Sequence, residues 1–268
     1  MGSTATLGAE HARPFVIQAK CLTQEPAVET RECRVIAMKR LSGRVLELRL
    51  EPDQRLCYGP GQYIEVLMAD GRARPFSIAN APHASGVLEL HVRFYHGGGF
   101  SRFAFTDLRK GEVLQIRGPL GHVRLRADDD RPAIFIAGGT GFAPIKSLIE
   151  QALGCATERP LYLYWGARAI QDLYMDELPR TWSGTCPWFR YVPVLSEPET
   201  SDHWRGRTGL VHEAVLQDFS ELSSYQVYTA GPPLMVQAVQ RSLLAGGLKQ
   251  EYFFSESFEP AGERLAYS

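Results

Sequence analysis

A glycine-rich turn near the middle of the chain separates an apolar strand from an amphipathic helix. The turn, Gly138–Pro144, reads GGTGFAP and follows the apolar run at 133–137. Apolar residues then recur every three or four positions as far as Leu153, which predicts a helix. A strand, a glycine turn and a helix together present backbone N–H groups and the positive end of a helix to a phosphate. The spacing therefore predicts a site for the pyrophosphate of a dinucleotide.

The turn departs at two points from the usual dinucleotide-binding fingerprint. Pro144 stands where that fingerprint has Gly or Ala. The next strand-like run, 161–165, is followed by Gly166-Ala167-Arg168 and lacks the acid that binds a ribose hydroxyl. Taken alone, the turn is also compatible with a structural turn that binds no ligand, so its assignment depends on the rest of the chain.

Two other segments have residue types that suit a cofactor. Arg74–Ile78 places a cation, an aromatic ring and a hydroxyl on one short extended segment, which suits a planar ring and its phosphate. The run 96–103 contains three consecutive glycines and is predicted to lead into a helix. It would form a second anion site at the start of that helix.

The elements that must position these segments fall into two regions. Up to about residue 125 the chain has closely spaced short strands separated by Gly, Pro and Asp turns, a pattern typical of an antiparallel barrel. After the charged stretch 126–132, strands alternate with helices, which predicts a doubly wound, mainly parallel sheet. The predicted strands are 34–38, 45–50, 63–67, 88–93, 113–116, 133–137, 161–165, 190–195, 226–229 and 252–254, and the predicted helices are 144–153, 172–178, 211–217 and 233–245.

The composition limits the classes of function. The chain has 268 residues, and its 29 basic and 30 acidic residues give a net charge of −1. This balance gives no reason to expect a nucleic acid or an anionic membrane as a partner. No apolar run approaches the ~20 residues that span a bilayer, and no signal peptide is visible, so we predict a soluble cytoplasmic protein. The five cysteines and seven histidines are scattered, so neither a disulfide framework nor a metal site is predicted.

Five segments occur in the order and approximate spacing of the ferredoxin–NADP reductase superfamily, which the chain resembles from about residue 30 to residue 258. They are RPFS at 74–77, GGFS at 98–101, GPLG at 118–121, GTGFAP at 139–144 and AGPP at 230–233. Three further runs, at 161–168, 204–209 and 253–258, resemble two branches of that superfamily. One branch is the reductase part of CDP-6-deoxy-glucoseen reductase and related oxygenase reductases. The other is the NAD(P)H:flavin reductases.

The resemblance implies a fold of two domains. Residues 28–128 would form a six-stranded antiparallel β-barrel that binds FAD. Residues 129–268 would form a doubly wound parallel-sheet NAD(P) domain with a C-terminal tail. Residues 1–27 are expected to be a flexible leader. Within it, Gln18-Ala19-Lys20 is similar to the segment after the last cluster cysteine of fused ferredoxin–reductases, either by chance or as the trace of a lost iron–sulfur domain.

The resemblance also implies which residues bind FAD. Arg74 would bind the pyrophosphate, Phe76 would lie against the isoalloxazine ring, and Ser77 would form a hydrogen bond near the reactive ring nitrogen. The other residues expected at the flavin or its phosphates are Pro75, His91, Val92, Arg93, Gly98, Gly99, Phe100 and Ser101.

The nicotinamide is expected on the other side of the flavin. Thr140 and the Gly231-Pro232 turn would bracket it, so that a hydride can pass between two stacked rings. We expect Ser77, Thr140 and Glu256 to be the catalytic residues, with Glu256 tuning protonation or orienting the nicotinamide. The remaining residues expected to contact a cofactor are Gly139, Gly141, Ala143, Pro144 and Phe258.

One position bears on the choice of nucleotide. Superfamily members that use NADP place Ser and then Arg after the third strand of this domain, where they bind the 2′-phosphate. The corresponding pair here is Ser196-Glu197, and a carboxylate repels a phosphate. NADH is therefore favoured, although Arg168 would partly compensate and NADPH stays possible.

Two features point to different electron acceptors. Ala230 stands where reductases of the superfamily commonly have cysteine. The flavin reductases resemble this chain in having alanine at this position. In contrast, the chain keeps Gly98–Ser101, which is expected of a protein that holds FAD tightly. Our first hypothesis is an FAD reductase that takes hydride from NADH and passes single electrons to a separate ferredoxin or oxygenase component. The alternatives are a reductase of free flavin and, as a different class, a nucleotide-sensing module.

Overall fold

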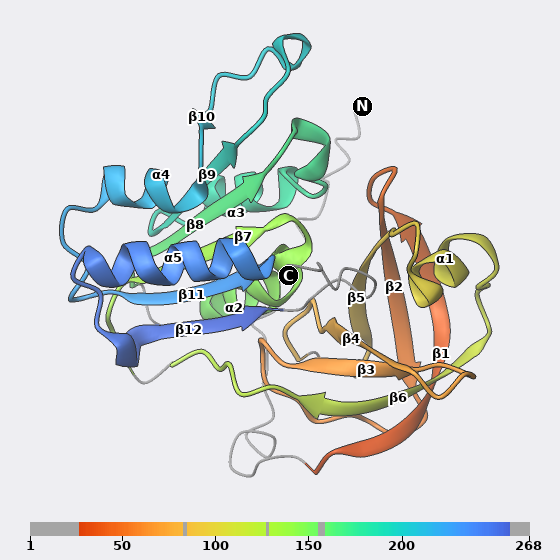
Figure 1. The fold of residues 1–268 in the computed structure, drawn as a ribbon. Helices are drawn as coiled ribbons and strands as arrows, with labels where there is room; N and C mark the ends of the chain where they lie inside the picture. Colours follow the sequence, from red (N-terminus) through yellow and green to blue (C-terminus); the bar gives the residue numbers. More distant parts are fainter. Residues whose placement is uncertain (1–26, 83–84, 127–128, 155–158, 258–268) are drawn as a thin grey trace, which may run out of the picture.

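The computed structural model describes residues 27–82, 85–126, 129–154 and 159–257, which form two six-stranded sheets (Figure 1). The predicted leader, apart from Ala27, and the predicted cofactor contact Phe258 lie outside these residues. The predicted boundary between residues 128 and 129 falls between the two sheets and stays a prediction. None of the described helices is both long and apolar enough to cross a membrane.

The first sheet is an antiparallel barrel. Its strands are β1 (Glu29–Arg40), β2 (Val45–Pro52), β3 (Tyr63–Leu67), β4 (Ala73–Ser77), β5 (Leu88–Arg93) and β6 (Val113–Leu120), in the order β4-β3-β6-β1-β2-β5. A bridge between Ile78 and Leu90 joins the two outermost strands of this order, so the sheet closes on itself. The six-stranded antiparallel barrel is therefore confirmed.

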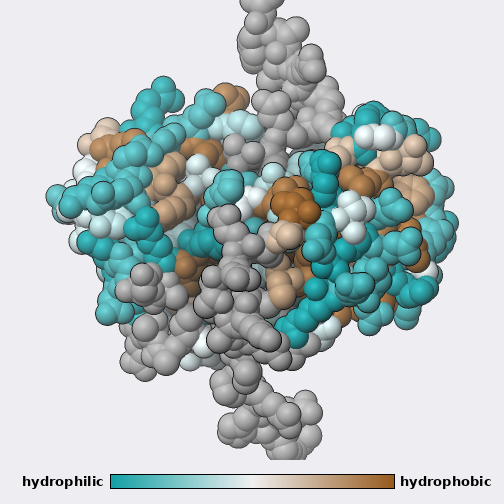
Figure 2. Space-filling view, turned by 90° about the horizontal axis from the view of Figure 1, so that it is seen from below, coloured by the Kyte–Doolittle hydropathy of each residue, from teal (hydrophilic) through white to brown (hydrophobic). Residues whose placement is uncertain are grey.

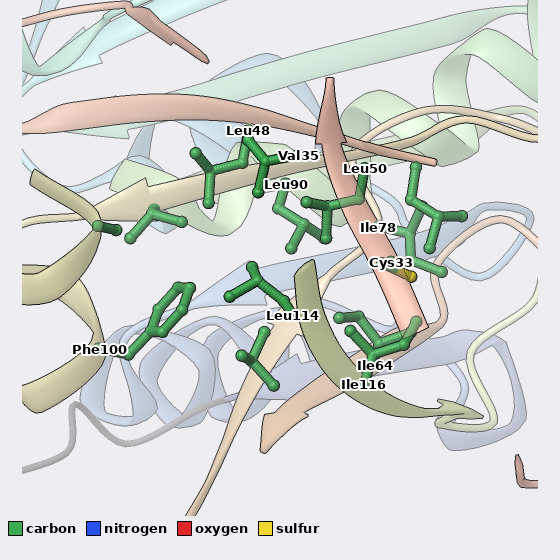
Figure 3. Close-up of a cluster of buried hydrophobic side chains, with 14 of the residues drawn as sticks. Cys33, Val35, Leu48, Leu50, Ile64, Ile78, Leu90, Phe100, Leu114 and Ile116 are labelled. Atoms are coloured by element: carbon green, nitrogen blue, oxygen red, sulfur yellow. The ribbon is translucent and has the colours of Figure 1, made fainter. Parts of the chain in front are cut away.

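Alternating apolar residues of these strands fill the interior of the barrel (Figure 3). Leu48, Leu50, Ile64, Leu90 and Ile116 are fully buried there. Burial of each such side chain contributes about 1.5–3 kcal/mol to stability. The core thus holds β4 and β5, the strands that carry the predicted flavin residues, in fixed positions.

The helix predicted after the second glycine turn is present. It is α1 (Gly99–Thr106), which connects β5 to β6 and has Gly98 as its N-cap. Phe100 is buried in the barrel core and lies with its ring centroid 5.1 Å from that of Phe76. The start of α1 is therefore held beside β4.

The second sheet is parallel and has helices on both faces. Its strands are β7 (Ala133–Gly138), β8 (Leu161–Ala167), β9 (Phe189–Leu195), β10 (Arg207–Thr208), β11 (Gln226–Gly231) and β12 (Phe253–Ser257), in the order β10-β9-β8-β7-β11-β12. The helices are α2 (Phe142–Gly154) and α3 (Glu177–Thr185) on one face, and α4 (Val211–Asp218) and α5 (Pro233–Ala245) on the other. The predicted doubly wound sheet is confirmed, and the carboxyl ends of its strands share one edge.

Two details of this half differ from the sequence-based prediction. The predicted helix at 172–178 is wrong, because a short 3-10 turn at 170–172 precedes α3, which begins only at Glu177. Pro179 lies in the first turn of α3, where its missing N–H costs nothing, whereas a proline is easily taken for the end of a helix. Strand β10 has two residues, too few to produce a recognisable pattern.

Candidate functional site

A pocket lies between the barrel and the parallel sheet, and most of the predicted site residues line it. Those residues are Arg74, Pro75, Phe76, Ser77, His91, Arg93, Gly98, Phe100, Ser101, Thr140, Gly141, Ala143, Pro144, Gly231, Pro232 and Glu256. Gly138, Ala230 and Tyr95 complete the lining. Segments from both halves of the chain therefore face one cavity.

The alternation of β5 separates two of the predicted residues. His91 and Arg93 line the pocket, whereas the side chain of Val92 is fully buried in the barrel core. Tyr95, two residues beyond Arg93, lines the pocket and was missed. A strict period of two along 91, 93 and 95 would have selected Tyr95 and excluded the Val92 side chain.

On the barrel side, positive groups lie beside an aromatic wall. Arg74 lines the pocket close to Phe76, and its guanidinium donates to the carbonyl of Ala73 at 3.0 Å. The N-terminus of α1 has no side-chain cap. Its free N–H groups and its dipole therefore favour an anion at Gly98.

A hydroxyl of the first turn of α1 shapes that helix terminus. The backbone N–H of Tyr95 donates to Oγ of Ser101 at 3.1 Å, and Gly98 N–H donates to the carbonyl of Tyr95 at 3.0 Å. A Cβ on Gly98 would overlap Oγ of Ser101. A glycine is thus required here for the close approach of the loop to the helix.

On the parallel-sheet side, the glycine turn is held by its neighbours. Gly139 has φ +53°, in the left-handed region that favours glycine, and its carbonyl accepts a hydrogen bond from Nε1 of Trp165 at 3.1 Å. Gly141 packs so closely on β11 that a Cβ would overlap the carbonyl oxygen of Ala230. The ring of Phe142 stacks on Trp165 with centroids 3.9 Å apart. Thr140 is therefore presented to the pocket by a rigid turn.

Glu256 is the carboxyl group with the most unusual environment in the pocket. It lies on β12 opposite Ala230 of β11, at the carboxyl ends of both strands. Burial raises the pKa of Glu256 to about 7, although the nearby Arg124 acts in the opposite direction. Near neutral pH this side chain is poised to hold or release a proton.

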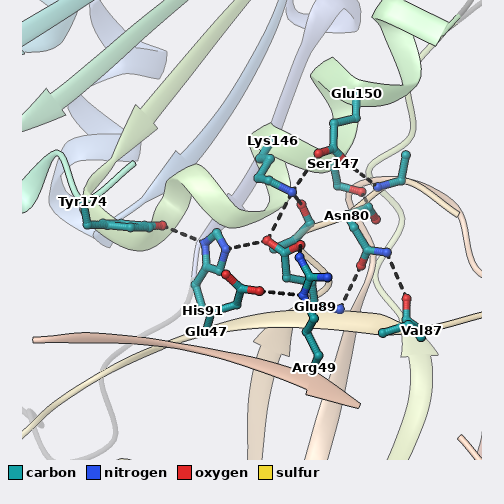
Figure 4. A network of polar contacts seen from close by, with 12 residues as sticks. Glu47, Arg49, Asn80, Val87, Glu89, His91, Lys146, Ser147, Glu150 and Tyr174 are labelled. Atoms are coloured by element: carbon teal, nitrogen blue, oxygen red, sulfur yellow. Dashed lines mark hydrogen bonds and ion pairs between the residues drawn. The ribbon is translucent and has the colours of Figure 1, made fainter. Parts of the chain in front are cut away.

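His91 lines the pocket, but both of its ring nitrogens already have protein partners (Figure 4). Nε2 lies 2.9 Å from the Glu89 carboxylate, and Nδ1 lies 2.9 Å from the hydroxyl of Tyr174. The ring can therefore contact a ligand only through its carbon atoms while these bonds persist. Arg93, the next residue on this face, forms a long ion pair of 3.7 Å with Asp172 of the other half.

Three predicted nucleotide contacts lie outside the pocket. Arg168, Ser196 and Glu197 are exposed at the carboxyl ends of β8 and β9. The N–H of Glu197 donates to the carbonyl of Arg168 at 2.9 Å, which holds the two segments side by side. They occupy the same edge of the sheet as the glycine turn. Gly99 and Gly139 adjoin the pocket through their lining neighbours Gly98 and Thr140.

Among the residues that the structure describes, no group of three or more His, Cys, Asp or Glu side chains is arranged to hold a metal ion. The described cysteines, Cys33, Cys57 and Cys186, are free thiols.

Comparison with known proteins identifies the family. Residues 32–125 match the oxidoreductase FAD-binding domain, and residues 135–241 match the oxidoreductase NAD-binding domain. The chain is 36% identical over 241 residues to the phenol hydroxylase P5 protein of Acinetobacter pittii, an alignment that covers 89% of this chain and 68% of that protein. This chain belongs to the ferredoxin–NADP reductase superfamily.

A second relative and a solved structure are also similar to this chain. The chain is 40% identical over 217 residues to the CDP-6-deoxy-L-threo-D-glycero-4-hexulose-3-dehydrase reductase of Yersinia pestis, and the alignment covers 81% of this chain and 64% of that relative. It thus spans less than two thirds of the length of that curated relative. The cytochrome P450 reductase GcoB of Amycolatopsis superposes with a TM-score of 0.82 at 29% identity, covering 88% of this chain and 72% of that one.

The barrel side of this reductase-family pocket fits FAD. A flavin needs an apolar face for its ring and positive groups for its pyrophosphate. Phe76 and Pro75 supply apolar surface, and Arg74 and the uncapped start of α1 supply positive charge. The parallel-sheet side presents the glycine turn and the edge of a doubly wound sheet, which suit a nicotinamide dinucleotide.

Proposed function

We propose that this chain is an NADH-dependent FAD reductase that passes single electrons to a separate iron–sulfur protein or oxygenase component. The observation that carries the proposal is the shared pocket, where Phe76 and Ser77 of the barrel face the same cavity as Thr140, Pro232 and Glu256 of the NAD-binding domain. Two rings that must meet for hydride transfer need this kind of cavity between two domains. The relatives named as a phenol hydroxylase protein and a dehydrase reductase support the choice of acceptor.

Bound FAD would accept a hydride and release electrons one at a time, which is the chemistry of the cofactor itself. The chain supplies orientation. Arg74 and the start of α1 would hold the pyrophosphate, and Phe76 would support the ring. The Ser77 hydroxyl would donate a hydrogen bond to a ring nitrogen, because it lines the pocket one residue from Phe76.

The NAD-binding domain would hold the second ring. Thr140 and the Gly231-Pro232 turn would bracket the nicotinamide, with the rigid turn limiting its movement. The carboxyl of Glu256, with a pKa raised by burial to about 7, would exchange a proton at the edge of the pocket near neutral pH. The mainly apolar walls would keep water away from the reacting atoms.

The preference for NADH is part of the proposal. Glu197 is exposed at the edge of the sheet and would repel the 2′-phosphate of NADPH. Arg168, whose carbonyl accepts the Glu197 N–H, would weaken that repulsion. We therefore expect a preference and not an absolute requirement. A cytoplasmic location stays a prediction.

A second candidate is a reductase that treats flavin as a substrate. Ala230, at the end of β11, lines the pocket where many superfamily reductases have cysteine, and the flavin reductases have alanine there. Against this, the Gly98–Ser101 turn offers an uncapped helix terminus for a retained FAD.

Dialysis and an anaerobic titration test the proposal. The purified chain is loaded with FAD, dialysed extensively, and examined by absorption spectroscopy before and after addition of NADH. We expect FAD to be retained and then bleached by NADH, and a candidate ferredoxin to restore its colour without oxygen. Loss of the yellow colour on dialysis, with activity only when flavin is added, would favour the second candidate. Retained FAD that NADH fails to bleach would exclude both.

A further inference from the structure

Buried polar contacts join the two domains directly beside the pocket (Figure 4). Helix α2 supplies Lys146, Ser147 and Glu150, and Glu150 follows Ser147 by three residues and Lys146 by four, which places it beside both of them on the helix surface. Lys146 is 4% exposed and Ser147 is 0% exposed. The barrel supplies the segment 79–81, which begins just after Ile78.

Each of these three side chains binds the backbone of that segment. Lys146 Nζ donates to the Ala79 carbonyl at 3.1 Å, Ser147 Oγ donates to the Asn80 carbonyl at 2.7 Å, and the Ala81 N–H donates to the Glu150 carboxylate at 2.9 Å. Hydrogen bonds are directional, so three in succession fix both the distance and the rotation of α2 against the barrel.

Lys146 also lies between two carboxylates. Its Nζ is 2.7 Å from Glu150 and 3.2 Å from Glu89 of β5. Burial disfavours the charged form of Glu89, but the hydrogen bond from His91 and the charge of Lys146 outweigh it and lower its pKa to about 2. A buried carboxylate that stays ionised must keep its partners, because separation from them would leave a charge without compensation.

The hydrogen bonds continue through His91 to the other domain. Because ionised Glu89 can only accept, Nε2 of His91 carries a hydrogen and donates it to that carboxylate. The hydroxyl of Tyr174 lies 2.9 Å from Nδ1 on the other side of the ring, and burial raises the pKa of this hydroxyl, so it keeps its proton. A continuous line of polar contacts therefore runs from Tyr174 through His91 to Glu89.

These contacts lie close to both reacting sides of the pocket. Helix α2 begins directly after the turn that carries Thr140, and the segment 79–81 begins two residues after Ser77. His91 lines the pocket itself. Any shift of α2 against the barrel would therefore change the separation of Thr140 and Ser77.

We infer that Glu89, His91, Lys146, Ser147, Glu150 and Tyr174 form a rigid joint that sets the spacing of the two cofactor rings. They are positioning residues, since they act through the elements that carry Ser77 and Thr140. A displacement of about 1 Å between reacting groups can reduce a rate about a hundredfold, so the joint governs hydride transfer without touching the hydride. The inference rests on the proposed function, because it takes the pocket as the place where the rings meet.

The test compares two tyrosine hydroxyls that each form a hydrogen bond. Tyr174→Phe removes one of the bonds that cross between the domains, whereas Tyr191→Phe removes a hydroxyl that donates to Asp176 at 2.6 Å within the NAD-binding domain. In FAD-free protein, we expect Tyr174→Phe and Ser147→Ala to speed backbone hydrogen exchange at 79–81 and 139–147 at least threefold. Tyr191→Phe should leave exchange in these segments unchanged.

In the FAD-loaded protein, stopped-flow reduction gives the second readout. At saturating NADH we expect Tyr174→Phe and Ser147→Ala to lower the rate constant about fivefold and Lys146→Met at least tenfold, with the Kd for NADH changed less than twofold. The long-wavelength absorption that reports stacked rings should weaken in parallel. Lys146→Arg should recover part of the rate lost in Lys146→Met.

The inference of a rigid joint would be overturned if Tyr174→Phe and Ser147→Ala fold and show both the hydrogen exchange and the flavin-reduction rate constant of the wild type. An equal effect of Tyr191→Phe would also overturn it, because it would indicate a general loss of stability. If Lys146→Met fails to fold, the two milder variants decide the question. If NADH does not reduce the wild type, the proposed function fails, and the exchange measurement still tests the joint.

Discussion

The two glycine turns lead into helices on opposite sides of one pocket, yet their glycines have different surroundings. In the barrel turn, a Cβ on Gly97 would have no atom within 4 Å, and one on Gly99 would meet none closer than 3.4 Å. In the sheet turn, a Cβ on Gly141 would overlap the Ala230 carbonyl, and Gly139 has a positive φ. The outer two glycines of the first turn have free space around them, although Gly98 between them packs against Ser101, whereas Gly141 of the second turn is enclosed by the backbone of β11.

This difference separates two reasons for using glycine. In the sheet turn, the close approach of the turn to β11 requires glycine at position 141 whether or not a nucleotide is present. In the barrel turn, Gly97 and Gly99 are free of such packing, and the uncapped start of α1 leaves N–H groups for a ligand. These surroundings fit the proposed function, in which the barrel turn would hold a retained cofactor and the sheet turn would dock a nucleotide that comes and goes.

The largest effect is expected when the packed glycine is replaced. Gly141→Ala would press a methyl group into the backbone of β11, which has no room to yield, and should lower the free energy of unfolding by about 3 kcal/mol. Gly97→Ala is the matched control and should change it by less than about 0.5 kcal/mol. Urea unfolding measures both. Equal losses in the two variants would contradict the distinction between the turns.

A smaller effect is expected at Glu256, on the sheet side of the pocket. Its pKa of about 7 in the folded chain exceeds its ordinary value of 4.5, so its contribution to stability is complete below pH 4.5 and is lost as the pH rises through 7. Between pH 5 and pH 8, the free energy of unfolding of the FAD-free wild type should fall by on the order of 2 kcal/mol more than that of Glu256→Gln, after allowance for the partial exposure of Glu256. Denaturant titrations at both pH values measure this. The exposed Glu251→Gln should behave like wild type; parallel pH curves for wild type and Glu256→Gln would refute the raised pKa.

On the barrel side, Ser77→Ala should separate chemistry from binding. Loss of one hydrogen bond that is made to the ring should slow flavin reduction by NADH about tenfold, equivalent to about 1.4 kcal/mol, and weaken FAD binding less. Stopped-flow absorption and FAD titration give the two numbers. Reduction at the wild-type rate would remove Ser77 from the proposed site.

The smallest effect is expected at the exposed edge of the sheet. Glu197→Arg replaces a repelling charge with an attracting one in screened surroundings, so the ratio of kcat/KM for NADPH to that for NADH should rise a few-fold, and the FAD content should not change. Steady-state kinetics with both nucleotides measure the ratio. A constant ratio would show that Glu197 does not face the 2′-phosphate.

Local pattern allowed much of this site to be predicted. Several motifs consist of consecutive residues, so they can be recognised without knowledge of the fold. They are the two glycine turns, the RPFS segment and the AGPP turn. The strand period would also have placed Tyr95 beside Arg93. The prediction of a helix at 172–178 was wrong because a proline such as Pro179 is compatible both with the end of one helix and with the first turn of the next.

Contacts between distant residues could not be predicted in this way. Lys146 and Ala79 are 67 positions apart, and nothing near either residue indicates the other. Lys146 alone is a cation in an amphipathic helix, which ordinarily implies a solvated surface position. Its burial follows from the packing of α2 against the barrel.

The order of short strands, glycine turns and helices was sufficient to predict a barrel, a doubly wound sheet and a pair of cofactor sites, because hydrophobic period and turn chemistry are local properties of the chain. The meeting of those sites in one pocket, the proton affinity of Glu256 and the joint around Glu89 and Lys146 depend on the folded arrangement. Burial and hydrogen bonding between segments far apart in sequence set the distances and the local dielectric, and neither quantity exists until the two domains are packed together.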